Sequence, residues 1–174
     1  MGSKNASSAD NQQATISDEY LAGFVDGEGC FYVGFSRRSD LPLGWQVITE
    51  FHLSQNLQGK NVLEAFCDRL DCGYLKPNHP KSLKDKSLVL IIKERKDLRE
   101  KLIPFFERHP LYSGKKQDFE IFKKVLEIVE KRNHLTKEGL SKIINLVFDR
   151  KRNSRKRYSK EAILETLGAS ETTR

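Results

Sequence analysis

Residues 21–29 read LAGFVDGEG and lead directly into residues 30–38, which read CFYVGFSRR. The first stretch predicts a short helix. Ser17 can cap its N-terminus, because a serine oxygen accepts a hydrogen bond from an unpaired N–H group of the first turn. Gly27 and Gly29 favour an exit soon afterwards, since glycine is common where helices end. We therefore expect one helix that passes almost at once into an extended segment.

The residues after this helix alternate in character, which predicts two strands. In residues 30–38 one face carries Phe31, Val33 and Phe35, and the other carries Tyr32, Gly34, Ser36 and Arg38. In residues 45–54 one face carries Trp45, Val47, Thr49, Phe51 and Leu53, and the other carries Gln46, Ile48, Glu50, His52 and Ser54. A period of two with one apolar face is typical of a strand that buries one side.

The rest of the chain continues the alternation of helices and strands. The pattern predicts a helix over residues 61–70, short strands over 73–77 and 87–93, and helices over 96–108 and 116–131. Two further helices should begin after Thr136 and Ser159, which are good capping residues. This order of elements predicts an α+β fold with a mostly antiparallel sheet. Residues 1–15, rich in Ser, Asn, Gln and Ala, predict a disordered leader.

The charge is unevenly distributed. The 174 residues carry 31 Lys and Arg against 24 Asp and Glu, a net charge of +7. The first 29 residues carry one Lys against five acids, whereas residues 132–174 carry eleven Lys and Arg against five acids. Basic side chains that hold phosphates, beside acids that hold a metal, suit an enzyme acting on a polyanion. The alternative is that the uneven distribution of charge along the chain has no function.

Several classes of protein are excluded by composition. No apolar run approaches the roughly 20 residues that span a bilayer, so we expect no membrane insertion. The first residues lack the apolar core of a secretion signal. Cys30, Cys67 and Cys72 lack zinc-ligand spacing, so we expect thiols in a reducing compartment.

Small residues give the first helix an unusual surface. Ala22, Gly23 and Gly27 lack bulk, so two such helices could pack closely about a two-fold axis. That packing would bring together two copies of Glu28, each at the negative end of a helix dipole. Two adjacent carboxylates add repulsion. Divalent cations with oxygen ligands relieve both penalties, which favours a metal site over an ordinary solvated acid.

The motif itself resembles that of a known family. LAGFVDGEG is similar to the defining sequence of the LAGLIDADG homing endonucleases. Five positions coincide with that consensus: Leu21, Ala22, Gly23, Asp26 and Gly29. Gly27 replaces an alanine and Glu28 replaces the last aspartate, which puts the number and placement of metal ions in doubt. The order of elements over residues 17–147 and the stretch over residues 111–143 also resemble the family.

The resemblance implies a fold, an assembly and an activity. The fold is an αββαββα core whose four-stranded antiparallel sheet forms a saddle over DNA, with extra C-terminal helices. It would occupy residues 16–148, followed over residues 149–174 by a basic loop and a C-terminal helix. A single motif implies a homodimer that hydrolyses both strands of a long, pseudo-palindromic DNA target with Mg²⁺, leaves short 3′ overhangs and promotes intron mobility. Ca²⁺ is expected to support binding without cleavage.

The resemblance also implies roles for particular residues. The metal ligands would be Glu28 and the main-chain carbonyl of Gly27, with Gln55 organising water and either Lys115 or Lys116 near the scissile phosphate. The helix interface would contain Leu21, Ala22, Gly23, Val25 and Asp26, the last in a structural role. The base-reading candidates are Tyr32, Ser36, Arg38, Gln46, Ile48, His52, Lys76 and Asn78. The phosphate-contacting candidates are Arg37, Lys81, Lys84, Lys86, Arg150, Arg152 and Arg155.

Two other functions fit the same resemblance. An RNA maturase would assist splicing of the host intron, and a DNA-binding regulator would have lost catalysis. Retention of an acid at Glu28 argues against the regulator. The resemblance is strongest to organellar intron proteins, which implies a chloroplast or a mitochondrion. The sequence does not specify the DNA target.

Overall fold

Helix α1 (Asp18–Glu28) passes without a loop into strand β1 (Gly29–Arg37). The structure is a computed structural model that describes residues 16–149 and 157–169. The predicted cap is confirmed, since the Ser17 hydroxyl accepts a 3.2 Å hydrogen bond from the Tyr20 N–H. A Cβ atom on Gly29 would lie 2.5 Å from the side chain of Val25. Glycine is therefore required for this abrupt change from helix to strand.

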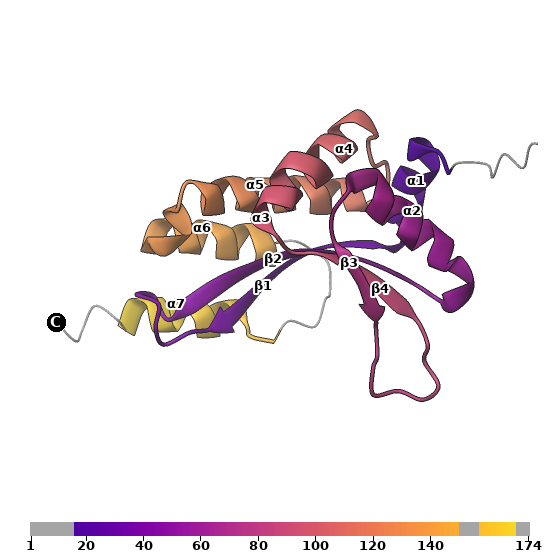
Figure 1. Ribbon diagram of the computed structural model, residues 1–174. Helices are drawn as coiled ribbons and strands as arrows, with labels where there is room; N and C mark the ends of the chain where they lie inside the picture. The colour runs from indigo at the N-terminus through magenta and orange to yellow at the C-terminus, as the bar shows by residue number, and fades with distance from the viewer. Residues whose placement is uncertain (1–15, 150–156, 170–174) are drawn as a thin grey trace, which may run out of the picture.

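The sheet has four antiparallel strands in the order β1-β2-β4-β3. β2 spans Trp45–Gln55, β3 spans Tyr74–Pro77 and β4 spans Leu88–Ile92. The short η1 turn (Leu57–Gly59) and helix α2 (Lys60–Leu70) connect β2 to β3. The predicted αββαββα order and the antiparallel sheet are confirmed. Figure 1 shows the helices α1 to α6 on one side of the sheet, with the β3–β4 connection reaching out on the other.

The helix predicted over residues 96–108 is interrupted by a wider turn. It consists of α3 (Arg95–Asp97), the π-helical turn η2 (Leu98–Leu102) and α4 (Ile103–Arg108). Pro104 stands at the start of α4 and has no N–H to donate to the preceding turn. The helix therefore contains a π turn directly before the proline.

The remaining helices end the chain. They are α5 (Lys115–Glu130), the short η3 (Asn133–Leu135), α6 (Lys137–Phe148) and α7 (Lys160–Ala169). The hydroxyl of Thr136 accepts from the Gly139 N–H at 3.1 Å, and that of Ser159 accepts from the Ala162 N–H at 3.1 Å. Both predicted caps are confirmed. No helix in the described ranges has the length and apolar character needed to cross a bilayer.

The core consists of two clusters on the helical side of the sheet. Around Phe31 and Phe51, the first joins α1 and α2 to α4 and α5 through a group of packed phenylalanine rings. The second surrounds Phe35, Trp45 and Val47 and contains residues of α5, α6 and α7. Ile163 of α7 is fully buried in it, and the Trp45 indole N–H donates to the Thr166 hydroxyl at 2.9 Å. Helix α7 therefore packs on the domain that we predicted to end at residue 148.

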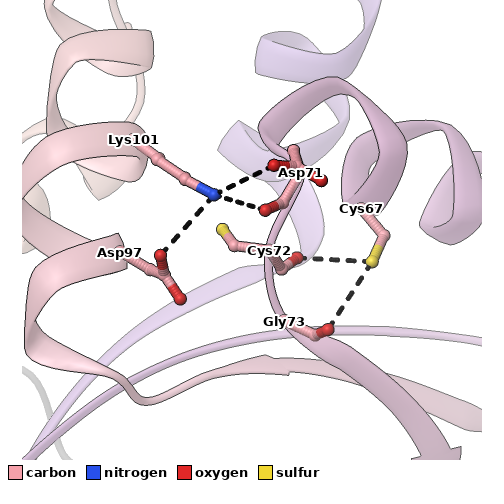
Figure 2. A network of polar contacts seen from close by, with 6 residues as sticks. All are labelled: Cys67, Asp71, Cys72, Gly73, Asp97 and Lys101. Carbon is pink, nitrogen blue, oxygen red and sulfur yellow. Dashed lines mark hydrogen bonds and ion pairs between the residues drawn. The ribbon is translucent and has the colours of Figure 1, made fainter.

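A polar network joins the end of α2 to the π-helical turn η2 (Figure 2). Asp71 ends α2 in the left-handed region, with φ of 48°, and Lys101 donates to its carbonyl oxygen. The Cys67 thiol donates to the Cys72 carbonyl at 3.3 Å. Burial raises the pKa of the Cys72 thiol to about 11, so it stays protonated at neutral pH. All three cysteines are thiols, as predicted.

Candidate active site and DNA interface

The end of helix α1 presents an unneutralised carboxylate. Glu28 is the last residue of α1 and is exposed, and the last turn of this helix contains no basic side chain. Within the part of the chain that the structure describes, the Glu28 carboxylate makes no hydrogen bond or ion pair with another side chain. A carboxylate at the negative end of a helix dipole is unfavourable without a cation. Carboxylate and main-chain carbonyl oxygens are the ligands that Mg²⁺ prefers, so Glu28 and Gly27 fit such an ion chemically.

The sheet register brings Gln55 to the same place. Gly29 pairs with Leu53 at the start of the β1–β2 ladder. Glu28 precedes that pair by one residue and Gln55 follows it by two, so both lie at this end of the ladder. The Gln55 side-chain oxygen accepts from the Asn56 N–H at 2.8 Å, and its stem packs so closely on Gly59 that a Cβ there would lie 2.3 Å away. Asn56 and the end of η1 therefore hold the Gln55 side chain.

Asp26 fastens the start of helix α5 to the end of helix α1. Its carboxylate accepts from the Ser113 hydroxyl at 2.7 Å, from the Ser113 N–H at 2.9 Å and from the Tyr112 N–H at 3.2 Å. The same hydroxyl accepts from the Lys115 N–H at 3.1 Å. Lys115 and Lys116 therefore begin α5 beside the last turn of α1. Lys115 is half-buried and Lys116 is exposed.

The exposed face of helix α1 differs from the predicted one. Leu21, Ala22 and Val25 are 1%, 5% and 0% exposed and belong to the protomer's own core. Their assignment to a subunit interface is wrong, because residues at i, i+1 and i+4 share the side of the helix that packs on the sheet. The opposite side carries Gly23 and Gly27, and a Cβ on either glycine would meet no atom within 4 Å. Tyr20 and Phe24 flank them and stack at 6.4 Å.

Most of the predicted base-reading residues share the face of the sheet that the core does not cover. The pairs Tyr32–Glu50, Gly34–Ile48 and Ser36–Gln46 stand side by side on β1 and β2. His52 continues this face along β2, and its ring stacks on that of Tyr32 at 5.9 Å. Lys76 lies exposed on β3, and Asn78 directly follows the end of that strand. The structure therefore brings these side chains onto one surface.

Arg38 is already paired within the chain. Its guanidinium donates to both carboxylate oxygens of Asp40, at 2.8 and 2.7 Å, and to the Gln46 side-chain oxygen at 3.4 Å. The hydrogen bonds between the two groups raise the pKa of Arg38 and lower that of Asp40. Both side chains are exposed, so solvent screens the pair. Any contact of Arg38 with a base competes with Asp40.

The predicted phosphate-contacting residues separate into three places. Arg37 lies on the other face of β1, where its guanidinium stacks 4.2 Å above the Trp45 ring. Lys81, Lys84 and Lys86 are exposed on the connection between β3 and β4, which projects from the sheet (Figure 1). Arg150, Arg152 and Arg155 lie outside the described residues. Arg157, the last residue of the same basic run, is described and exposed.

Metal-ligating side chains do not converge within the described part of this chain. Among residues 16–149 and 157–169, no group of three or more His, Cys, Asp or Glu side chains is arranged to hold an ion. Glu28 thus supplies one carboxylate at an exposed helix end. Further oxygen ligands would have to come from main-chain carbonyls, a second copy of α1, water or a phosphate.

Comparison with known proteins agrees with this geometry. The family described as LAGLIDADG endonuclease matches residues 21–126, from α1 into α5. The chain belongs to the LAGLIDADG endonuclease family. A probable intron-encoded endonuclease of Neurospora crassa is 31% identical over 137 residues, which are 78% of this chain and 25% of that protein. The chain spans only 25–28% of the length of the first curated relatives that it matches.

Two solved LAGLIDADG structures share the fold. The crystal structure of the homing endonuclease I-TnaI is 37% identical and superposes with a TM-score of 0.74, over 89% of this chain and 98% of that chain. The LAGLIDADG homing endonuclease I-LtrWI bound to its target DNA is 29% identical with a TM-score of 0.74, over 82% of this chain and 46% of that chain. In the present chain the motif, residues 21–29, forms most of helix α1 and the first residue of β1.

Proposed function

We propose that this LAGLIDADG protein is a site-specific DNA endonuclease that cuts both strands of a long, pseudo-palindromic duplex as a homodimer. The observation that carries the proposal is the unneutralised Glu28 carboxylate at the end of α1, beside Gln55 and the α5 lysines. Family membership supports it, as does the I-LtrWI structure, which holds that protein's target DNA. Cleavage of an intronless allele would promote intron mobility, in the chloroplast or mitochondrion that carries the intron.

The proposed subunit interface is the small-residue face of α1. Gly23 and Gly27 are open to solvent, with Tyr20 and Phe24 beside them. Interaxial distances between packed helices depend on the side chains at the contact, so two glycines allow a close approach. Tyr112 is 86% exposed and its N–H binds Asp26, so it would extend the same interface. Two copies of Glu28 would then meet at the two-fold axis.

Each residue at this axis has a separate task. Glu28 and the Gly27 carbonyl would hold Mg²⁺, which supplies an activated water and stabilises charge on the leaving oxygen. Gln55, held by η1, orients a water beside the scissile bond. Lys115 or Lys116 holds the scissile phosphate, and the Asp26–Ser113 contact fixes the distance of those lysines from the end of α1. Two half-sites read by two subunits lie about one helical turn apart on the duplex.

A selection experiment tests this function and identifies the target sequence at the same time. Random-sequence duplexes are captured by the protein in Ca²⁺, and the recovered pool is then incubated with Mg²⁺. We expect wild-type protein to enrich a pseudo-palindromic sequence and to cut both strands, with short 3′ overhangs. The variant Glu28→Gln should bind the same sequence without cutting it.

Three outcomes of the selection contradict the proposal. Binding without cleavage in Mg²⁺, Mn²⁺ and Ca²⁺ alike would favour a DNA-binding regulator. Failure to enrich any duplex, together with binding of structured intron RNA that speeds its splicing, would favour a maturase. Full cleavage by Glu28→Gln would remove Glu28 from the reaction.

A further inference from the structure

The open face of the sheet carries one carboxylate. Glu50 is the only acidic residue in the four strands, and it lies on β2 between Ile48 and His52 of the same face. Its side chain is 28% exposed. A carboxylate in the middle of a surface that faces a polyanion is repelled by phosphates. A donor on a base edge would offset this repulsion.

His52 fixes the direction of the Glu50 carboxylate, and Tyr32 supports the His52 ring. The His52 ring donates from Nε2 to Oε2 of Glu50 at 2.9 Å, which leaves the other carboxylate oxygen available. Tyr32 pairs with Glu50 across the β1–β2 ladder, and its ring lies parallel to that of His52, at an interplanar angle of 9°. Gly34 makes room for Tyr32, because a Cβ there would lie 2.2 Å from the tyrosine oxygen. The three side chains thus form a supported unit.

The chemistry of base edges decides what this unit can recognise. In the major groove, guanine presents only acceptors at N7 and O6, and thymine presents the O4 acceptor and a methyl group. A carboxylate repels each of these acceptors. Cytosine presents the N4 amino donor, and adenine presents an amino donor next to the N7 acceptor. Cytosine is therefore the base that donates a hydrogen bond to the carboxylate without placing an acceptor of its own beside it.

We propose that Glu50, held by His52 and Tyr32, selects cytosine at one position in each half of the DNA target. This inference rests on the proposed function, because it requires the open face of the sheet to lie in the major groove. The carboxylate contributes to specificity in two ways, by accepting from the cytosine amino group and by rejecting guanine and thymine. Its contribution to total affinity is small, because its charge is repelled by the surrounding phosphates.

The test compares target preferences base by base. Wild-type protein, Glu50→Gln and Glu50→Asp are each used to select from a library that varies the enriched target at every position. We expect wild type to prefer cytosine about 10-fold at one symmetry-related pair of positions. Glu50→Gln should abolish that preference or transfer it to adenine, since an amide matches adenine, and should leave the other positions unchanged. Glu50→Asp keeps the carboxylate and should retain a weaker cytosine preference.

The matched control is Glu64→Gln, which removes the same charge from the exposed side of α2. It should leave every position unchanged. An identical profile for wild type and Glu50→Gln, in protein that still selects a target, overturns the inference and leaves the proposed function standing. A uniform change over all positions also overturns it, because charge alone would then explain the effect. Failure of wild type to select any DNA overturns both.

Discussion

The carboxylate of Asp26 accepts a 2.7 Å hydrogen bond from the hydroxyl of Ser113, a residue 87 positions later in the chain. The same carboxylate also accepts from the Ser113 main-chain N–H at 2.9 Å. This contact joins the last turn of α1, which carries Glu28, to the first turn of α5, which carries Lys115. The geometry of the proposed active site depends on it.

Removal of the Ser113 hydroxyl should slow cleavage more than it weakens DNA binding. In Ser113→Ala the Asp26 carboxylate loses one of its three donors, which costs about 1–2 kcal/mol in unfolding free energy. We expect a drop of about 10-fold in the single-turnover cleavage rate, with the Kd for DNA nearly unchanged. Ser113→Thr keeps the hydroxyl and should restore most of the rate. Equal losses of cleavage rate for Ser113→Ala and Ser113→Thr would show that the hydroxyl group does not determine the rate.

Bulk on the exposed side of α1 should prevent dimer formation. Gly23→Leu places a large side chain where the structure leaves open space, and it raises intrinsic helix propensity by up to about 1 kcal/mol. We expect sedimentation to give a monomer whose thermal unfolding is not lowered. The control is Lys142→Leu on the exposed side of α6, which should remain a dimer. A Gly23→Leu protein that stays dimeric would place the interface elsewhere.

The lysines of the β3–β4 connection should contribute to affinity without specifying sequence. Replacing Lys81, Lys84 and Lys86 by Ala removes phosphate contacts, and each lost contact lowers the slope of log K against log salt by about 0.9. We expect weaker binding to target and unrelated duplexes alike. Titrations at several salt concentrations measure the slope. An unchanged slope would exclude these lysines from the interface with DNA.

Helix α7 should contribute to the stability of the whole domain. Ile163 is fully buried in the second core cluster, and its replacement by Ala should cost about 2–5 kcal/mol in unfolding free energy. Glu165→Ala changes an exposed residue of the same helix and should cost little. Denaturant unfolding of both variants measures the difference. Similar small losses of unfolding free energy in both variants would mean that α7 does not stabilise the domain.

The Cys72 thiol should react slowly with alkylating reagents at pH 8. Burial raises its pKa to about 11, and only the thiolate is nucleophilic. Labelling followed by mass spectrometry should modify the exposed Cys30 first and Cys72 only as the pH approaches 11. Rapid modification of Cys72 at pH 8 in folded protein would contradict the buried thiol.

Local signals in the sequence predicted the elements well. The caps at Ser17, Thr136 and Ser159 and the alternation on either side of Phe31 and Phe51 depend only on near neighbours in the chain. They gave the helices and the strands, and the LAGLIDADG motif gave their order. The open face of the sheet followed from the same alternation, because every second residue of a strand points to one side.

Contacts between distant segments could not be predicted in the same way. The Asp26–Ser113 contact joins residues that are 87 positions apart and has no local pattern. The orientation of α1 was also hidden, because its residues are small or apolar on both sides and either side could have packed on the sheet. The sequence predicts Arg38 as a base-reading residue but does not show that Asp40, two residues later, binds its guanidinium. Glu50 shares the open face with the predicted base-reading residues, but the contact of its carboxylate with His52 is seen only in the structure.

We propose that DNA cleavage by this LAGLIDADG protein depends on the Glu28 carboxylate at the end of helix α1. The most direct test is the single-turnover rate of cleavage of the selected duplex in Mg²⁺, at saturating protein, for wild type and Glu28→Gln. We predict that the substitution lowers the rate on both strands at least about 100-fold, because metal-assisted stabilisation is worth several kcal/mol, while the Kd measured in Ca²⁺ changes little. Equal cleavage rates for the two proteins, at equal occupancy of the DNA, would contradict the claim.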